Sequence, residues 1–146
     1  MAVNVLGAAA FLVKASDRSL SNLELQKLLY IAHMFYLGRH NAPLVHGHFQ
    51  AWYYGPVHPD LYREARIYGA RPVRMVYRAP EMDDQSREAA LLQKTYEGLG
   101  DATPGTLVSI THRKDGAWDK HYTPGKRGVI IPNEDILQEY RDCGYD

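Results

Sequence analysis

The sequence predicts a mostly α-helical fold of the α+β type with little strand, in which several helices form a compact single domain beside a short extended or hairpin segment. Three observations support this fold class. Apolar residues recur at helical spacing in several stretches, one segment rich in glycine and proline cannot form a long helix, and the 146 residues contain no repeat or linker. A chain of this length fills one ordinary domain, so we assign residues 1–146 to one.

The first two helices are predicted from composition and from a capping motif. Residues 5–14 are rich in good helix formers and are followed by turn-forming serines. Ser21 and Glu24 match a capping box, in which each side chain satisfies a backbone N–H group at the start of a helix. A second helix therefore begins after Ser21, and Gly38 is predicted to end it.

The second helix carries the broadest apolar face in the chain and is predicted to form the centre of the core. Its apolar residues follow one another at intervals of three and four: Leu25, Leu28, Leu29, Ala32, Phe35 and Tyr36. The polar Gln26, Lys27 and His33 are expected to lie largely off this face.

The segment from Pro43 to Pro59 is predicted to be extended, with a short strand, because its glycines and prolines forbid a long helix. Successive side chains of an extended chain point to opposite sides. We therefore expect Trp52 and Tyr54 to lie inside and Tyr53 nearer the surface. Tyrosine at a surface is a common contributor to protein interfaces, although packing in the core is the alternative for these aromatic residues.

The middle of the chain contains a predicted helix and a predicted strand. Pro59 suits the first turn of a helix over residues 60–68, which Gly69 ends. Residues 73–78 alternate between apolar and basic side chains, apart from Val76, and are predicted to form an exposed edge strand.

Three helices are predicted in the remainder. The first spans residues 83–97, with Ala89, Leu92 and Tyr96 on its apolar side. A short helix over 105–111 follows an N-cap threonine and a first-turn proline. The last helix spans 134–141, with Asn133 as its N-cap.

The charge balance argues against nucleic acid as a partner. Seventeen basic residues match seventeen acidic ones, so the chain has no excess positive charge to displace counterions from a phosphate backbone. The densest basic run, over residues 63–78, is interrupted by acidic, glycine and proline residues. A nucleic-acid-binding regulator is kept as the second functional hypothesis.

Cysteine usage and hydropathy predict a cytoplasmic protein with no membrane association. The single Cys143 cannot form an intramolecular disulfide, which fits a reducing compartment. The apolar run over residues 2–13 has no preceding Lys or Arg and is shorter than the ~20 residues that span a bilayer.

Seven histidines raise the hypothesis of a metal site, most directly at His46 and His48. These two share a face of an extended segment, and His58, His112 and His121 are the possible further ligands. No carboxylate accompanies the pair at ligand spacing, and no His-Glu-x-x-His motif occurs. Nothing presents a nucleophile beside a base, and no glycine-rich phosphate loop is found. We therefore predict no catalytic, metal-binding or cofactor-binding residue, and a histidine-based hydrolase is the weakest hypothesis.

Four motifs occur together in a specific order: LQKLLY at 25–30, AWYYGPV at 51–57 followed by Tyr62, Thr111-His112 followed by Trp118, and IIPNE at 130–134 followed by Tyr140. In this order and spacing the chain resembles the Panacea or SocA-like antitoxin family, from about residue 8 to residue 140. The sequence departs from the family in two places. Ala117 stands where the family usually has a proline before the tryptophan, and residues 70–100 match no motif.

The resemblance implies a non-enzymatic antitoxin, encoded beside a cognate protein toxin that it neutralises by direct binding. In the founding SocA-type systems the antitoxin also delivers its toxin to the protease ClpXP as an adaptor. The resemblance leaves open whether the protein forms a homo-oligomer.

The residues that carry the resemblance are expected to form the scaffold: Leu25, Lys27, Leu28, Leu29, Tyr30, Trp52, Gly55, Pro56, Tyr62, His112 and Trp118. The candidate toxin-binding residues are Tyr53 and three arginines of the unmatched stretch, Arg71, Arg74 and Arg78. A predicted edge strand there would be open for pairing with a partner. The alternative, in which these arginines are only a solvated edge, stays open.

Overall fold

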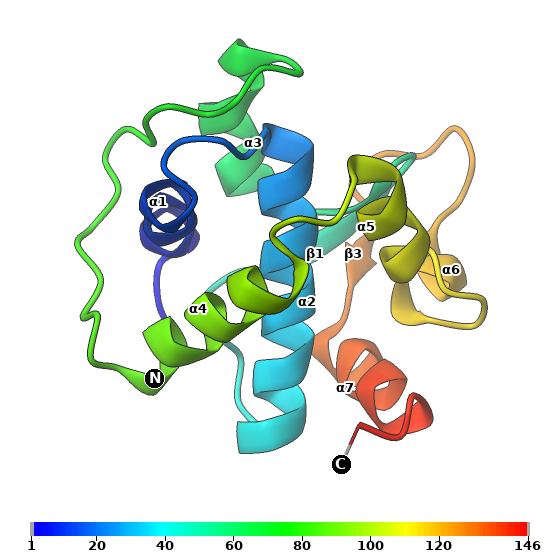
Figure 1. The fold of residues 1–146 in the computed structure, drawn as a ribbon. Helices are drawn as coiled ribbons and strands as arrows, with labels where there is room; N and C mark the ends of the chain where they lie inside the picture. Colours follow the sequence, from blue (N-terminus) through cyan, green and yellow to red (C-terminus); the bar gives the residue numbers. More distant parts are fainter. Residues whose placement is uncertain (1, 146) are drawn as a thin grey trace.

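The central helix α2 (Asn22–His40) runs through the middle of the fold, and the other elements pack around it (Figure 1). The structure is a computed structural model that describes residues 2–145. In chain order the other elements are α1 (Val5–Ala15), β1 (Phe49–Trp52), β2 (Gly55–Val57), α3 (Pro59–Ala65), the 3₁₀ helix η1 (Arg66–Tyr68), α4 (Arg87–Leu99), α5 (Pro104–Thr111), α6 (Ala117–His121), β3 (Ile130–Ile131) and α7 (Asn133–Asp142). The predicted fold class, mostly helical with minor strand content, is confirmed.

The two ends of α2 differ in how well the sequence predicts them. The capping box is confirmed: the Ser21 hydroxyl accepts from the Glu24 N–H at 3.2 Å, and the Glu24 carboxylate accepts from the Ser21 N–H at 2.9 Å. The predicted end at Gly38 is wrong, because α2 continues to His40 and Asn41 adopts the left-handed conformation with φ of 50°. Gly38 serves another purpose, since a Cβ there would lie 2.2 Å from the ring of Tyr140 in α7.

The middle of the helix α2 is buried on all sides. Its leucines at 25, 28 and 29 are buried as predicted. The expectation that the polar residues lie off the buried face is wrong, because Gln26 and Lys27 are each 1% exposed and His33 is 0% exposed. The physical reason is that α4, α5, α7, α1 and the sheet surround this helix, so no side of it faces solvent along its middle.

The sheet is small, antiparallel and ordered β2-β1-β3. Trp52 pairs with Gly55, so Tyr53 and Tyr54 alone form the turn of the β1–β2 hairpin. Both turn residues project into solvent, with exposed fractions of 69% for Tyr53 and 62% for Tyr54. The predicted position of Tyr53 is confirmed. The inward position predicted for Tyr54 is wrong, because the alternation of strand side chains ends where the turn begins.

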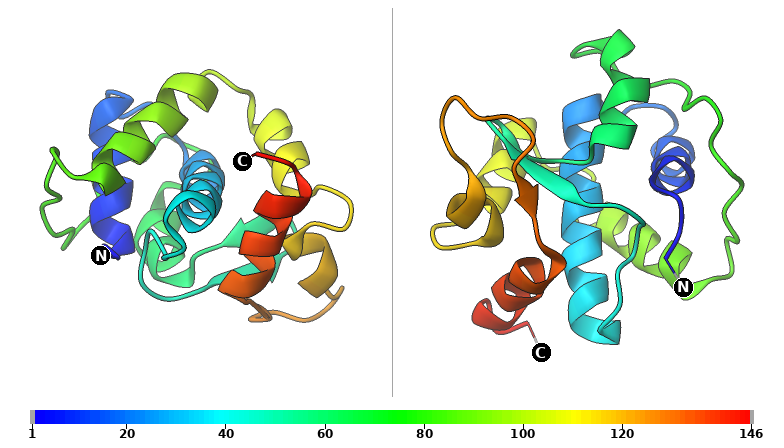
Figure 2. Two further views of the ribbon diagram at one scale, coloured as in Figure 1. Left: turned by 90° about the horizontal axis from the view of Figure 1, so that it is seen from below. Right: turned by 180° about the vertical axis from the view of Figure 1, so that it is seen from behind.

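The predicted edge strand over 73–78 is wrong. Val73 and Val76 are buried while Met75 and Tyr77 are exposed, a spacing of three in place of the alternation of a strand. The segment is irregular, anchored where the Val73 N–H donates to the carbonyl of Leu20 at 2.8 Å. It crosses the outside of α1 between α3 and α4 (Figure 2).

The remaining helices follow the predictions with three corrections. The helix α4 begins at Arg87 behind the N-cap Ser86, four residues later than predicted. The short helix α6 was not predicted. The N-cap of α7 is Pro132 and not Asn133, whose side-chain oxygen bonds to His33 at 3.0 Å. The expected 60–68 helix is present as α3 continued by η1.

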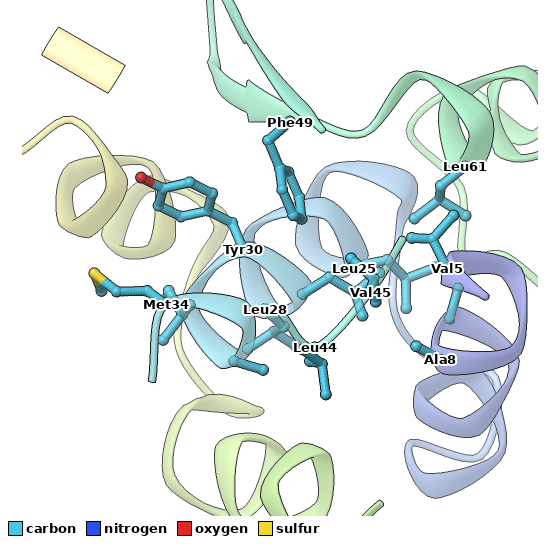
Figure 3. Close-up of a cluster of buried hydrophobic side chains, with 14 of the residues drawn as sticks. Val5, Ala8, Leu25, Leu28, Tyr30, Met34, Leu44, Val45, Phe49 and Leu61 are labelled. Atoms are coloured by element: carbon cyan, nitrogen blue, oxygen red, sulfur yellow. The ribbon is translucent and has the colours of Figure 1, made fainter. Parts of the chain in front are cut away.

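One contiguous apolar cluster forms the core. Figure 3 shows part of it, where side chains of α1, α2, β1 and α3 converge with Leu44 and Val45. Within residues 2–145, no helix combines the length and hydrophobicity required to cross a membrane.

Replacing Gly38 by alanine tests the close approach of α2 and α7. The added methyl group would collide with the ring of Tyr140, so we expect a loss of about 1–3 kcal/mol in the free energy of unfolding. Gly98 in α4 is the matched control, because a Cβ there meets nothing within 4 Å. Gly98→Ala should be neutral or stabilising by up to about 1 kcal/mol, since alanine is the better helix former. Chemical denaturation of both variants measures the difference, and equal values would contradict the close packing.

Candidate functional site

Two polar residues of α2 hold the hairpin against the helix. The side-chain amide of Gln26 accepts from the N–H of His58 at 2.7 Å and donates to the carbonyl of His58 at 3.2 Å. The Nζ of Lys27 donates to the carbonyl of Pro56 at 3.0 Å. β2 is one of the two outer strands of the sheet, and these bonds occupy backbone groups that pairing with another strand would otherwise use.

We call Gln26 and Lys27, with their hydrogen bonds to the hairpin, the clamp. Lys27 is the residue of the clamp whose pKa is shifted. Burial lowers the pKa of Lys27 from 10.5 to about 7, because the interior solvates an ammonium group less well than water does. The side chain is therefore only partly charged at neutral pH. Its one hydrogen bond to the Pro56 carbonyl is available to the neutral amine as well as to the ammonium group.

Gly55 lets the hairpin approach this helix closely. Its φ of 119° is unfavourable for other residues, and a Cβ would lie 3.0 Å from Cε of Lys27 and 3.2 Å from Nε2 of His112. The hairpin thus contacts α2 and the end of α5 at one point. Burial lowers the pKa of His112 and the neighbouring Lys27 lowers it further, so the neutral imidazole predominates at pH 7.

A stack of three aromatic rings also contacts the hairpin. The indole of Trp118 stacks on the ring of His112, with a centroid distance of 3.7 Å and an interplanar angle of 7°. It also stacks on the ring of Tyr122, with a centroid distance of 4.8 Å and an interplanar angle of 13°. The indole N–H donates to the carbonyl of Trp52 at 2.7 Å. These contacts fix α6 and the chain after it beside the hairpin.

Ala117, the departure from the family pattern, starts α6 in a way that proline could not. Its N–H donates to the carboxylate of Glu139 at 3.0 Å, and the hydroxyl of Tyr30 donates to the same oxygen at 3.1 Å. Burial raises the pKa of Glu139, although both hydrogen bonds act in the opposite direction. Proline has no N–H group, so it would leave this buried carboxylate with one donor fewer.

A groove of about 690 Å³ opens beside the hairpin. The first turns of α2, the hairpin, the loop after η1 and the segment 122–127 form its walls, and the views agree that this last segment lies beside the hairpin turn (Figures 1 and 2). Five of its lining residues are aromatic: Trp52, Tyr53, Tyr54, Tyr62 and Tyr122. Tyr62 packs edge-on against Trp52 at a centroid distance of 4.7 Å. Aromatic residues thus make up a third of the fifteen residues that line the groove.

The charges along the groove are of one sign. Its exposed charged residues are Lys126 and Arg127, and none of the described lining residues is aspartate or glutamate. The buried Lys27 also lines the groove but is only partly charged at neutral pH. The guanidinium carbon of Arg127 lies 5.0 Å from the ring centroid of Trp52, within range of a cation–π interaction.

The structure separates the four candidate toxin-binding residues. Tyr53 lines the groove, and Arg71 lies next to the wall formed by Gly69 and Ala70. The guanidinium group of Arg71 donates to the carbonyls of Ile67 and Tyr68, at 3.2 and 3.1 Å. Arg74 is exposed and does not line the groove, and Arg78 lines a different hollow beside α3. Their role in binding stays a prediction.

The residues missed from the sequence include one aromatic and two basic residues of the groove: Tyr122, Lys126 and Arg127. Tyr122 follows Trp118 by four residues, and this helical spacing could have indicated that the two rings stack. The two basic residues lie in a glycine-containing loop that carries no such signal.

The histidines that the sequence suggested as metal ligands do not come together as one site in the described residues. No group of three or more His, Cys, Asp and Glu side chains within residues 2–145 is placed to hold a metal ion. The ring of His58 bonds to the carbonyl of His46 at 2.9 Å. Burial lowers the pKa of His33 to about 4, and its neutral ring connects Asn133 to the N–H of Val45.

These observations define a small helical scaffold that presents an aromatic groove on a rigidly held hairpin. The family model for the SocA-like antitoxins, Panacea domain, matches residues 25–119, and the chain belongs to this family. The match includes Gln26 and Lys27, the hairpin, His112 and Trp118, and it ends before Tyr122 and the rest of the groove wall at 122–127.

The chain is also similar to the antitoxin SocA of Caulobacter vibrioides (strain NA1000 / CB15N). The two are 38% identical over 117 residues, which cover 72% of this chain and 61% of SocA. The chain therefore matches about three fifths of the length of that relative. No solved structure matches the chain.

Titration of Lys27 should make stability depend on pH. Between about pH 7 and 10.5 the unfolded chain binds more protons at this residue than the folded chain, so the free energy of unfolding should rise with pH. The slope contributed by one group is at most about 1.4 kcal/mol per pH unit. Lys27→Met should lack this rise, whereas Lys94→Met, at an exposed position of α4, should retain it. Denaturation at pH 7, 8 and 9 provides the measurement, and parallel profiles for all three proteins would contradict the burial of Lys27.

Proposed function

We propose that this protein is an antitoxin that neutralises a cognate protein toxin by direct binding, without catalysing a reaction. The observation that carries the proposal is the match to the SocA-like antitoxin family over residues 25–119, a segment that includes the hairpin and its clamp. The similarity to SocA of Caulobacter vibrioides supports the same role.

The surface of the protein is consistent with this proposal. Tyr53 and Tyr54 are exposed on a turn whose neighbouring strands are hydrogen-bonded to α2 and packed on Trp118. Exposed aromatic residues on a rigid support are typical of protein-binding surfaces, because they bury a large area and lose little conformational entropy on binding. Family membership and this surface thus favour a protein partner.

A titration distinguishes binding from catalysis. We expect the toxin to be encoded by the neighbouring reading frame, and the activity of that product is measured at increasing amounts of this protein. We expect inhibition to rise linearly and to end at a fixed molar ratio set by the oligomeric states of the two proteins, because a binder is consumed by its target. A protein that modified the toxin enzymatically would inhibit at far lower ratios and progressively with time. Full toxin activity at a large excess, with no co-purification, would contradict the proposal.

The second part of the proposal is that the bound toxin is delivered to ClpXP. Its support is the resemblance to SocA-type systems, in which the antitoxin acts as an adaptor. We expect the toxin to have a shorter half-life in cells that contain both this protein and ClpX than in cells that lack either one. Pulse-chase measurement of the toxin tests this, with toxin expressed alone as the control. Equal half-lives in all strains would restrict the function to binding.

A further inference from the structure

We propose that the groove beside the hairpin holds an extended segment of the toxin in which apolar or aromatic side chains are flanked by carboxylates. This inference rests on the proposed antitoxin function and adds the place of docking and the chemistry of the bound segment. Three properties of the groove support it: its size, its aromatic lining and the single sign of its charges.

The size and lining of the groove suit side chains of a peptide. Its volume of about 690 Å³ is in the usual range of 300–1,000 Å³ for binding sites that enclose a ligand. Trp52 and Tyr62 form a half-buried base, and Tyr53 and Tyr54 stand above it in solvent. An apolar side chain placed between them would remove several ring faces from water at once.

The charges select the residues around that apolar side chain. Lys126 and Arg127 are exposed on the same wall, and no described lining residue supplies a carboxylate to neutralise them. Arg127 lies over the ring of Trp52, which positions its guanidinium group at the mouth of the groove. Guanidinium groups bind carboxylates through paired hydrogen bonds, so an aspartate or glutamate of the partner has a ready counter-charge there.

We expect the groove to recognise side chains and not to add a strand at β2. β2 is at the edge of the sheet, but Gln26 and Lys27 already occupy the backbone groups of Pro56 and His58. A partner strand would have to break these buried hydrogen bonds before it could pair with β2. An edge strand with free backbone groups carries no such free-energy cost.

A protein segment fits better than a nucleic-acid strand. The chain has equal numbers of basic and acidic residues, and the groove offers only two exposed cations. Continuous binding of phosphates requires a longer basic track. Two cations are sufficient for one or two carboxylates.

The test compares two matched charge reversals in the full-length protein. The groove variant is Lys126→Glu with Arg127→Glu. The control is Lys94→Glu with Arg39→Glu, which also changes one lysine and one arginine lining a single hollow. Arg39 lies 5.5 Å from the ring centroid of Phe35, and Arg127 lies 5.0 Å from that of Trp52. Circular dichroism first confirms that both variants fold, and titration calorimetry against the toxin then gives the dissociation constants.

We expect the groove variant to bind the toxin at least about tenfold more weakly, because opposed like charges replace the attraction. The control should stay within about threefold of the wild type, and Tyr53→Ala should also weaken binding. Overlapping toxin peptides used as competitors should identify one acidic and apolar segment. Changing its carboxylates to lysine should restore binding to the groove variant.

The outcomes separate the two proposals. If the wild type binds and neutralises the toxin and the groove variant does so within about threefold, the docking inference is overturned while the antitoxin function stands. If the wild type does not bind the toxin, both fall. Binding of single-stranded DNA, probed with an oligothymidine and lost in the groove variant, would assign the groove to nucleic acid instead.

Discussion

The buried contact between α2 and the edge strand β2 is the constraint on which the rest of the structure depends. An outer strand has backbone groups that need partners, and Gln26 and Lys27 supply them from the middle of a helix. The lysine is costly to bury, and its lowered pKa is the measure of that cost. Replacing it with an apolar residue would leave the Pro56 carbonyl without this donor in the interior. The clamp therefore requires polar residues at positions where a helix of this kind would otherwise be apolar.

The clamp also determines where the groove can form. With β2 held against α2, Gly55 brings the hairpin onto Lys27 and His112, and His112 begins the stack that continues through Trp118 to Tyr122. The groove walls are thus parts of one connected set of contacts, although they come from distant parts of the sequence. The two tyrosines of the turn are exposed to solvent, and the ring of Tyr53 faces Tyr122 edge-on at a centroid distance of 6.5 Å. A rigid base with a few exposed rings loses little entropy when a partner binds.

The sequence could predict features that depend on neighbouring residues and not those that depend on the tertiary environment. The Ser21–Glu24 capping box and the leucine spacing of α2 are local patterns, and both are present. Gln26 was predicted to lie off the buried face on the assumption that one side of the helix faces water. That assumption fails for α2, because other elements surround its middle. Gly38 has the composition of a helix end but is required by the ring of Tyr140, about a hundred residues away in sequence. The groove was only partly predictable for the same reason. Tyr53 was identified from the alternation of side chains expected in an extended segment, whereas Lys126 and Arg127 reach the site through the packing of a loop.

The charge of the whole chain and the charge of the groove support different conclusions. A balanced sequence argues against a partner that needs many cations in a row. The net charge of the chain does not describe the local charge of the groove, where Lys126 and Arg127 lie together and no described lining residue is acidic. Because screening in salt limits the influence of exposed charges to about 8–10 Å, acidic residues elsewhere on the molecule do little to cancel this local field. A neutral protein can therefore present a positive site of the size of one or two side chains. Such a site discriminates between a short acidic peptide and a polyanion, and its aromatic lining adds the requirement for an apolar side chain beside the acid.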